Sequence, residues 1–379
     1  MKRVAIFRSQ LLPLSETFIR DQALALTTWK PVLVGLNDVA DGLRTSGIAR
    51  EVIRQSDSRI DRAVQFWLQR PIPQLVTKLR ELQCSLVHAH FGMDATLAWP
   101  SVNACKLPML VTLHGWDINI HRQWWERGHG GLRGIVYPSR LLRLAVEPSV
   151  HFIAVSEAIR HRAIEFGIPA EKISVSYIGV DTARFKPSGS PLSQRANRVL
   201  FVGRMVEKKS PLLVVRAFAE LRNRLPDAEL VMIGDGPLRA SAERMAAELS
   251  TPVTFLGASN ADTVRAQLAL AKAFCLPSHT AANGDAEGLP ISILESIASG
   301  VPVVTTRHSG NPEPLDTEST DVLIEEPSVT SLQNALFDVL TRAEPSRVKA
   351  TDRLTEFKAR FEIRSTSRVL ETLYGSLSH

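Results

Sequence analysis

The chain has 379 residues, of which 44% are hydrophobic and 22% are charged. This composition indicates an ordinary globular protein, and the length exceeds that of a usual single core, so we expect two domains. The net charge of +6 is uneven, because residues 1–190 carry an excess of eight positive charges and residues 191–379 have two more acidic than basic residues. The asymmetry indicates an anionic partner of the first half other than nucleic acid, or simply solubilising arginines.

Three cysteines, Cys84, Cys105 and Cys275, form an odd and widely spaced set. Such a set excludes a disulfide framework and paired metal ligands, and we therefore expect a reducing cytoplasm. The apolar run at 4–7 ends at Arg8 and is too short for a signal peptide or a membrane span. We expect it to be the first strand.

Short apolar segments alternate with longer amphipathic ones along the whole chain. This alternation predicts an α/β fold with two doubly wound parallel sheets facing across a cleft. We expect an N-terminal domain over 1–186, a Pro/Ser-rich linker over 187–197, a C-terminal domain over 198–350, and helices over 351–379 that pack back on the N-terminal domain. The predicted strands are 4–7, 32–35, 86–89, 109–113, 152–155 and 173–177 in the first domain, and 199–202, 229–233, 253–256, 273–276, 302–305 and 322–324 in the second.

Several polar residues follow strands in the first half. Ser15 is a good N-cap, and the helix that it begins, with Glu16 as its next residue, has N–H groups that suit an anion. His90 alternates with His88 on a strand, and His114 follows the next strand. Three histidines suggest a metal, but no carboxylate or cysteine completes a convincing ligand set, so we predict no metal and assign the histidines to structure or to substrate contacts.

A segment rich in arginine and aromatic residues follows at 122–143. Arginine and tryptophan together favour the membrane interface, where the ring lies at headgroup depth and the cation meets phosphate. A mobile substrate loop or packing between domains explains the same composition. The residues concerned are Arg122, Trp124, Trp125, Arg127, Arg133, Tyr137, Arg140 and Arg143.

In the second half, Arg204 and Lys209 follow the strand 199–202 and precede a helix. Open α/β sheets bind ligands beyond the carboxyl ends of their strands, so both cations are placed to hold a diphosphate. Surface solvation is the ordinary alternative. The glycines of Gly234-Asp235-Gly236 predict only a turn with close backbone approach.

Two glutamates, Glu287 and Glu295, are eight positions apart across a turn and the start of a helix. Gly288 frees the backbone, Pro290 lies where a missing N–H is tolerated, and an apolar face follows. A helix N-terminus favours phosphate. The alternative is that Glu287 only complements the helix dipole and Glu295 is an exposed helix residue.

The segment 285–313, DAEGLPISILESIASGVPVVTTRHSGNPE, resembles the signature of the retaining GT-B glycosyltransferases of family 4, and it is most similar to the exopolysaccharide and colanic-acid type. The resemblance extends to 154–157 and 178–181. It implies that Glu287 contacts the donor sugar, Glu295 the ribose, and Arg204 and Lys209 the diphosphate. It also implies further donor contacts from His114, Gly288, Leu289, Ile291 and Leu256, and acceptor contacts from Ser15, Glu16, His90, Trp116 and Asp117.

Ser210 and Pro290 stand where relatives have glycine, Tyr177-Ile178 replaces proline and asparagine, and the paired glycines after the first strand are absent. The last difference leaves the acceptor side open.

The resemblance implies a hexose transfer from a nucleotide diphosphate sugar, with UDP-glucose or UDP-galactose favoured and GDP-mannose next, to a polyprenyl-diphosphate or other lipid-linked saccharide. It implies no cofactor or metal, and peripheral contact with the anionic inner face of the cytoplasmic membrane. A sugar-nucleotide epimerase or an inactive sugar-nucleotide-binding protein are the alternatives. The sequence does not indicate the linkage, the acceptor, the oligomeric state or the type of intermediate.

Overall fold

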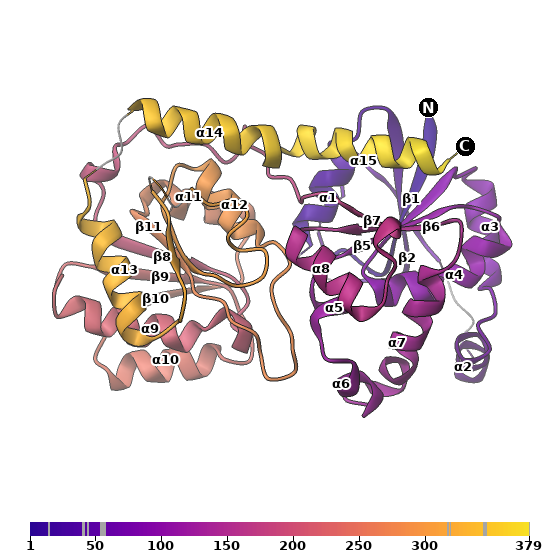
Figure 1. The fold of residues 1–379 in the computed structure, drawn as a ribbon, viewed down its shortest axis with the longest axis horizontal. Coiled ribbons are helices and arrows are strands. Elements are labelled where there is room, and N and C mark those ends of the chain that lie inside the picture. The colour runs from indigo at the N-terminus through magenta and orange to yellow at the C-terminus, as the bar shows by residue number, and fades with distance from the viewer. Residues whose placement is uncertain are drawn as a thin grey trace. The chain divides into compact units, whose positions relative to one another are not determined.

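The computed structural model describes residues 1–13, 16–39, 42–43, 45–53, 58–316, 318, 320–343 and 347–378. The chain forms two compact units, which are coloured mainly indigo to magenta and pink to orange in Figure 1. Unit 1 contains Met1–Gly179 and Ile363–His379, and unit 2 contains Val180–Glu362. Each unit is built on one parallel sheet, as the alternating pattern predicts.

The sheet of unit 1 has the order β3-β2-β1-β4-β5-β6-β7. All six strands predicted for this half are present. The additional strand β3 has an exposed edge and the sequence AREV, so it has no apolar run that would have indicated it. The strands are β1 Lys2–Leu11, β2 Trp29–Asp38, β3 Ala49–Val52, β4 Leu86–His90, β5 Met109–Leu113, β6 Val150–Ala154 and β7 Ile173–Val175.

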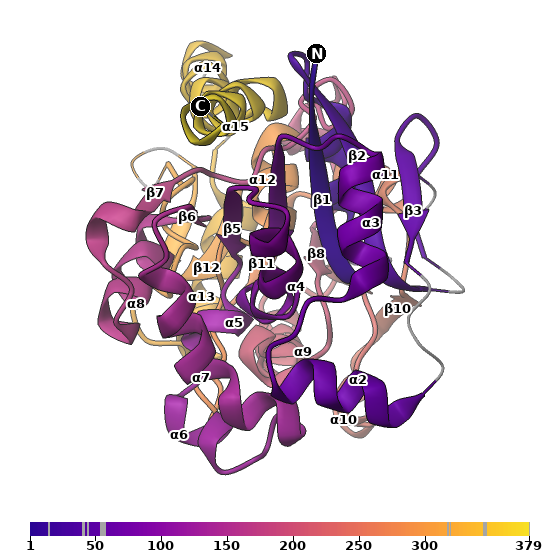
Figure 2. The ribbon, with the colours of Figure 1, turned by 90° about the vertical axis from the view of Figure 1, so that its right-hand side faces the viewer.

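Helices surround this sheet, and α4 packs against β1, β4 and β5 while α8 packs against β6 and β7 (Figure 2). The C-terminal helix α15 closes the core, with Leu370 and Tyr374 almost fully buried beside Trp29 and Leu33. The helices are α1 Thr17–Leu24, α2 Arg59–Trp67, α3 Pro73–Glu81, α4 Gly92–Ala104, α5 Trp116–Asn119, α6 Arg122–Glu126, α7 Gly131–Ala145, α8 Glu157–Phe166 and α15 Ile363–Leu377.

Unit 2 has the strand order β10-β9-β8-β11-β12-β13, and all six of its strands were predicted. The strands are β8 Arg198–Val202, β9 Glu229–Ile233, β10 Val253–Gly257, β11 Ala273–Leu276, β12 Val303–Thr306 and β13 Val322–Ile324. The helices are the short 3₁₀ helix η3 Glu207–Lys209 and the α-helices α9 Pro211–Arg222, α10 Arg239–Glu248, α11 Ala261–Leu270, α12 Ile291–Ala298, α13 Val329–Thr341 and α14 Arg347–Phe361.

The boundaries between the units differ from the predicted ones in two places. The segment 351–379 does not act as one piece, because α14 packs on α12 of unit 2 and only α15 belongs to unit 1. Residues 180–186 belong to unit 2, where the N–H of Val180 donates to the carbonyl of Phe361 at 2.9 Å. Helical periodicity predicts both helices but carries no information about which core each one covers.

The strand order reverses between β1 and β4 in unit 1 and between β8 and β11 in unit 2. At such a switch point the loops on either side diverge, which leaves room for a ligand beyond the carboxyl ends of the strands.

Candidate functional site

An ion pair lies at the switch point of unit 2. Nζ of Lys209, in η3 after β8, donates to Oε1 of Glu287, in the loop after β11, at 2.8 Å. The side chains are 13% and 7% exposed. Gly203 makes room for this contact, because a Cβ there would lie 2.7 Å from Cδ of Lys209. The structure therefore brings together two of the predicted donor-binding residues that are 78 positions apart.

The carboxylate of Glu287 is held ionised. Burial raises its pKa, but the charges of Lys209 and Lys208 and hydrogen bonds from Lys209 and Ser278 outweigh burial and lower the pKa to about 2. The hydroxyl of Ser278 donates to Oε1 at 3.1 Å. At neutral pH Glu287 is thus a fixed negative charge in a nearly enclosed position.

The loop after β11 is fastened to η3 by three consecutive residues. Beside Lys209, Nζ of Lys208 donates to Oδ1 of Asp285 at 2.9 Å, and Oε1 of Glu207 accepts the N–H of Ala282 at 3.0 Å. Sequence reasoning missed Lys208 and Asp285. The signal was present as two adjacent lysines and an acidic residue two positions before Glu287, but their pairing depends on the neighbouring position of β8 and β11.

Arg204 follows β8 as predicted and its side chain is exposed. Ser210, at a position where the resemblance predicts glycine, adopts the left-handed conformation with φ +53°. Its hydroxyl lies 2.7 Å from Nδ1 of His279. This hydrogen bond helps to hold a serine in a backbone conformation that favours glycine.

The remaining predicted donor residues lie just before α12, on α12 and on β10. Pro290 is the N-cap of α12 with φ −66°, one position before the helix begins at Ile291. Glu295 on α12 is 9% exposed, so it is not the exposed helix residue of the alternative interpretation, and Leu289 before the helix is 5% exposed. Gly288 is also buried, whereas Leu256 on β10 is 37% exposed.

In unit 1, the side chains of His90 and His114 are hydrogen-bonded to each other. Nδ1 of His90 lies 3.0 Å from Nε2 of His114, so one ring donates and the other accepts. Nδ1 of His114 is enclosed and has no hydrogen-bond partner among the described residues. Burial lowers the pKa of both rings well below 6.5, and nearby Arg8 lowers both further. The pair is neutral at pH 7.

His88 is a structural residue. Its Nδ1 lies 2.7 Å from the hydroxyl of Tyr374 on α15, and its Nε2 lies 2.7 Å from the hydroxyl of Thr112. Burial lowers the pKa of His88 to about 3. This ring therefore links β4 to the C-terminal helix.

Asp117, a predicted acceptor residue, is fully buried, and its carboxylate accepts hydrogen bonds from the backbone. Its Oδ1 accepts the N–H groups of His114 and Gly115, both at 3.0 Å, and its Oδ2 accepts that of Gly92 at 2.9 Å. The tight turn after β5 leaves these N–H groups without strand partners, and the carboxylate satisfies them. Trp116, the neighbouring candidate, is 39% exposed.

Glu16, another predicted acceptor residue, is also hydrogen-bonded within unit 1. Both of its carboxylate oxygens accept hydrogen bonds from Arg8, which in addition pairs with Asp94. Glu16 is 8% exposed and His90 is 1% exposed, so both predicted acceptor contacts are enclosed. The prediction for Ser15 lies outside the described residues.

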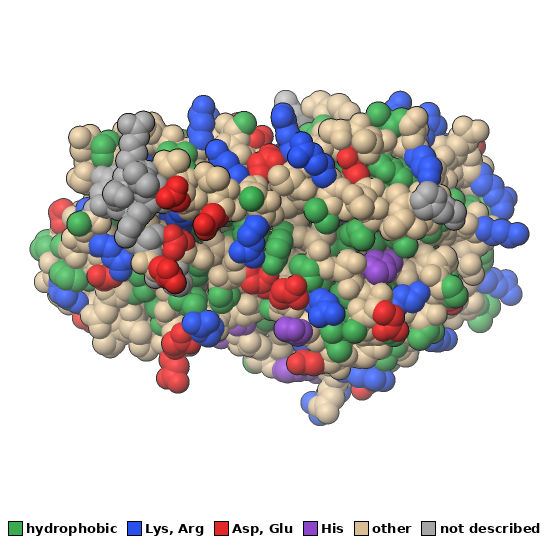
Figure 3. All heavy atoms as spheres, turned by 45° about the horizontal axis from the view of Figure 1, so that its top comes forward, with side chains coloured by type: hydrophobic (Ala, Val, Ile, Leu, Met, Phe, Trp, Pro, Cys, Tyr) green, Lys and Arg blue, Asp and Glu red, His purple; other side chains and the backbone are tan. Residues whose placement is uncertain are grey.

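The aromatic and basic segment 122–143 is not one surface. Trp125 and Tyr137 are buried, and the hydroxyl of Tyr137 donates to the carbonyl of Asp117 at 2.6 Å. Arg140 is 6% exposed, while Arg122 and Arg127 are exposed. Three of the eight residues of this predicted segment, Trp125, Tyr137 and Arg140, are therefore buried. Tyr137 and Arg140 lie on the side of α7 that packs inward, and α7 contacts α4. On the face drawn in Figure 3, basic side chains are interspersed with acidic and apolar ones.

Within the described ranges, no three His, Cys, Asp or Glu side chains converge as metal ligands would. In the same part of the chain, no helix has both the length and the apolar character needed to cross a bilayer.

Two family models cover most of the chain. Glycosyltransferase Family 4 matches residues 38–184, and Glycosyl transferases group 1 matches residues 184–355. A GDP-mannose-dependent alpha-(1-6)-phosphatidylinositol monomannoside mannosyltransferase of Mycobacterium tuberculosis is 33% identical over 339 residues, which are 85% of this chain and 82% of that protein. The chain belongs to glycosyltransferase family 4. This family 4 member also resembles the amylovoran biosynthesis glycosyltransferase AmsK of Erwinia amylovora, with 31% identity over 58% of this chain and 56% of AmsK, so the match spans little more than half of that relative.

Solved structures show the same GT-B fold. The crystal structure of Anabaena HepE in complex with UDP and glucose superposes on this family 4 member with a TM-score of 0.78 at 17% sequence identity. The match covers 99% of this chain and 100% of the HepE chain. At this identity the likeness establishes the fold, as the resemblance of the sequence predicted.

Proposed function

We propose that this chain is a retaining hexosyltransferase that moves a hexose from a nucleotide diphosphate sugar to a lipid-linked saccharide during bacterial exopolysaccharide or lipopolysaccharide assembly. The main support is the ion pair of Lys209 and ionised Glu287 at the switch point of unit 2. Membership of family 4 and the relative named for amylovoran biosynthesis agree with this class of reaction.

The pair suits a reaction in which charge separates. As the glycosidic bond breaks, the anomeric carbon becomes positive and the departing diphosphate gains negative charge. Glu287 is a fixed anion for the sugar. The ammonium group of Lys209 has three N–H donors, so it can keep its bond to Glu287 while it donates to phosphate, and exposed Arg204 offers a two-pronged contact.

We assign Glu295 to the ribose, and the buried backbone around Gly288 and Leu289 to the sugar. The acceptor hydroxyl attacks the face from which the nucleotide leaves, which retains the configuration at the anomeric carbon. His114 contacts the donor sugar only after its ring turns, because Nε2 engages His90 and Nδ1 is enclosed. The reaction needs no metal in this proposal, so EDTA should leave it unchanged.

The donor is UDP-glucose, UDP-galactose or GDP-mannose. A UDP-sugar was favoured by the resemblance of the sequence, and the mycobacterial relative that aligns over most of the chain is named as GDP-mannose-dependent. Calorimetry with UDP and with GDP distinguishes the two classes, since the correct nucleotide should bind tightly and the other weakly. If neither UDP nor GDP bound tightly, the proposed donor site would be rejected.

A transfer assay tests the whole proposal. The protein is incubated with each radiolabelled sugar nucleotide and a membrane lipid extract. We expect label to move into the lipid fraction. Isomerised sugar would indicate an epimerase instead, and unchanged donor would indicate a binding protein. Flotation with vesicles that contain anionic lipid tests the peripheral membrane contact, and binding that does not depend on that lipid would reject it.

A further inference from the structure

A hollow of about 730 Å³ lies at the carboxyl edge of the unit 1 sheet. It is lined by the ends of three neighbouring strands, with Gln10 from β1, Asn37 from β2 and Val52 from β3. This is the edge at which open parallel sheets bind ligands. None of the residues predicted from the sequence for donor or acceptor lines the described part of the hollow.

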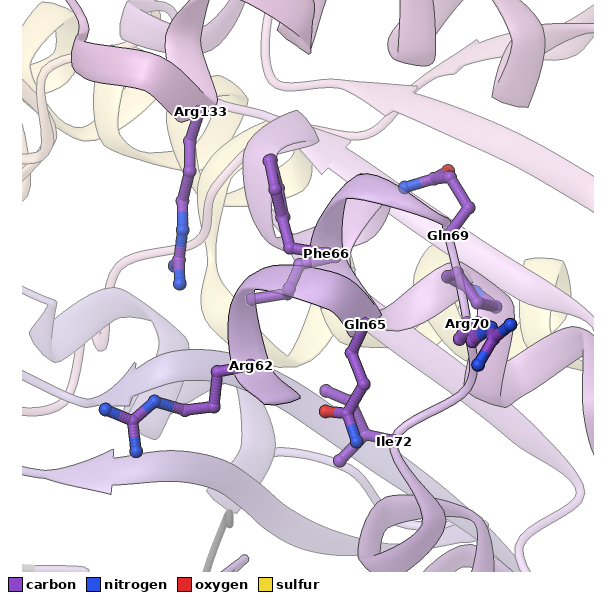
Figure 4. Close-up of a pocket in the computed structure, with 9 residues that line it drawn as sticks. Arg62, Gln65, Phe66, Gln69, Arg70, Ile72 and Arg133 are labelled. Carbon is purple, nitrogen blue, oxygen red and sulfur yellow. The ribbon is translucent and has the colours of Figure 1, made fainter. Parts of the chain in front are cut away.

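Two arginines from different helices line the hollow: Arg62 from α2 and Arg133 from α7. Both also line an adjoining pocket that includes Arg70 and Phe66, where Arg133 extends toward α2 (Figure 4). The acidic residue that lines the described hollow, Asp38, is already paired with Arg50. Among the described lining residues the basic ones are Arg62 and Arg133, and guanidinium groups match phosphate in geometry as well as in charge.

The helix that carries Arg62 is fixed against α7. The guanidinium carbon of Arg140 lies 4.1 Å from the ring centre of Phe66, and its Nη2 donates to the carbonyl of Phe66 at 2.9 Å. The guanidinium carbon of Arg133 lies 5.2 Å from the same ring centre. The positions of Arg62 and Arg133 relative to each other are therefore set by contacts between α2 and α7.

Exposed apolar side chains lie on the same two helices. Trp67 and Leu68 at the end of α2 are 45% and 59% exposed, and Leu132 and Ile135 on α7 are 69% and 39% exposed. Figures 1 and 2 both place α2 and α7 at one end of unit 1. A ligand with a phosphate and a hydrocarbon chain matches both features, because apolar surface gains free energy when it leaves water.

We propose that this hollow, between α2, α7 and the ends of β1 to β3, binds the phosphate group of an amphiphilic acceptor through Arg62 and Arg133, while the hydrocarbon chain lies on the apolar side chains of α2 and α7. The inference rests on the proposed function, because it names the acceptor site of that transferase. A recessed site with arginines on two elements fits a single phosphate group better than a flat bilayer surface.

Calorimetry with farnesyl phosphate, below the concentration at which it aggregates, tests the site without turnover. We expect Arg62→Gln and Arg133→Gln each to weaken binding by roughly 10- to 100-fold, since each removes charge-assisted hydrogen bonds. Arg143→Gln is the matched control, because Arg143 is exposed on α7 and does not line the hollow, and its affinity should equal that of the wild type. Farnesol and inorganic phosphate should each bind far more weakly.

Several outcomes would overturn the proposal. The first is that Arg62→Gln and Arg133→Gln bind farnesyl phosphate as tightly as the wild type does. The second is that the wild type binds farnesol or inorganic phosphate as tightly as farnesyl phosphate. The third is that the protein binds phosphatidylglycerol vesicles but not farnesyl phosphate. Thermal unfolding confirms that each variant is folded. Titration of the same variants with UDP and GDP separates the two proposals, because loss of acceptor binding with intact nucleotide binding concerns this site alone.

Discussion

The two switch points of this protein hold their polar side chains differently. In unit 2, Lys209 and Glu287 form an ion pair whose side chains are 13% and 7% exposed, whereas in unit 1, His88, His90 and Asp117 are 0%, 1% and 0% exposed. Glu287 is held ionised, and the unit 1 histidines are neutral. The comparison teaches that the two switch points stabilise their polar groups differently: unit 2 pairs opposite charges, whereas in unit 1 the buried neutral rings form hydrogen bonds to each other and to the C-terminal helix.

Replacement of Glu287 by alanine should have the largest effect. We expect transfer to fall by roughly 10³-fold, because a charge placed for the transition state is lost. The assay measures label in the lipid fraction, with circular dichroism to verify the fold. Glu229→Gln is the control, since Glu229 is exposed at the amino end of β9, away from the carboxyl edge of the sheet, and is paired with half-buried Arg198. Equal activity of Glu287→Ala and the control would remove Glu287 from the mechanism.

Replacement of Lys209 by methionine should destabilise unit 2. It leaves Glu287 buried without its main partner, at a cost of about 3 kcal/mol in the free energy of unfolding. Urea unfolding measures this cost. Combination with Glu287→Gln should recover most of the loss, because the unpaired charge is then gone. If the losses in the free energy of unfolding caused by Lys209→Met and by Glu287→Gln simply added up in the double variant, the two side chains would not be coupled.

Acid should remove the stabilisation contributed by His88 at a higher pH than the stabilisation contributed by Glu287. His88 has a pKa of about 3 in the fold and about 6.5 when unfolded, so the unfolded chain binds more protons and stability falls as the pH drops below about 6.5. Glu287 has a pKa of about 2 in the fold against 4.5, so its contribution is lost only below about pH 4.5. Hydrogen exchange of peptides around 86–90 and 285–287, corrected for the intrinsic rate, should show this order.

His88→Gln is the control. Because this variant lacks the ring that titrates, it should lose less protection around 86–90 than the wild type between about pH 6.5 and 4.5. If protection around 86–90 were lost across that interval to the same extent in His88→Gln and in the wild type, the assignment to His88 would be wrong.

The smallest expected effects concern Ser210. Ser210→Ala loses the hydrogen bond to His279 and keeps the left-handed backbone, so the free energy of unfolding should fall by about 1 kcal/mol. Ser210→Gly loses the same bond but relieves the backbone, and should be nearly neutral. Thermal unfolding compares the two. A glycine variant less stable than the alanine variant would show that the backbone is not strained here.

The sequence alone determined the architecture, and it predicted roles for the glutamates and cations of unit 2 that the structure leaves as predictions. Strand and helix periodicity is a local property, so twelve strands were predicted and the one that escaped, β3, has no apolar run. Arg204, Lys209 and Glu287 follow strands, and a position after a strand is also local. The internal partners of the predicted acceptor residues were not predicted, since nothing local in the sequence shows that Glu16 pairs with Arg8 or that Asp117 accepts backbone N–H groups.

Only the tertiary structure decided which groups meet and which are enclosed. Lys209 and Glu287 are 78 positions apart and His88 and Tyr374 are 286 apart, and neither separation is encoded in any local pattern. The hollow of unit 1 likewise depends on α2 and α7, which are fixed to each other by Arg140 and Phe66. Burial and pairing set the charge state of each group, and both are properties of the packed chain rather than of its segments.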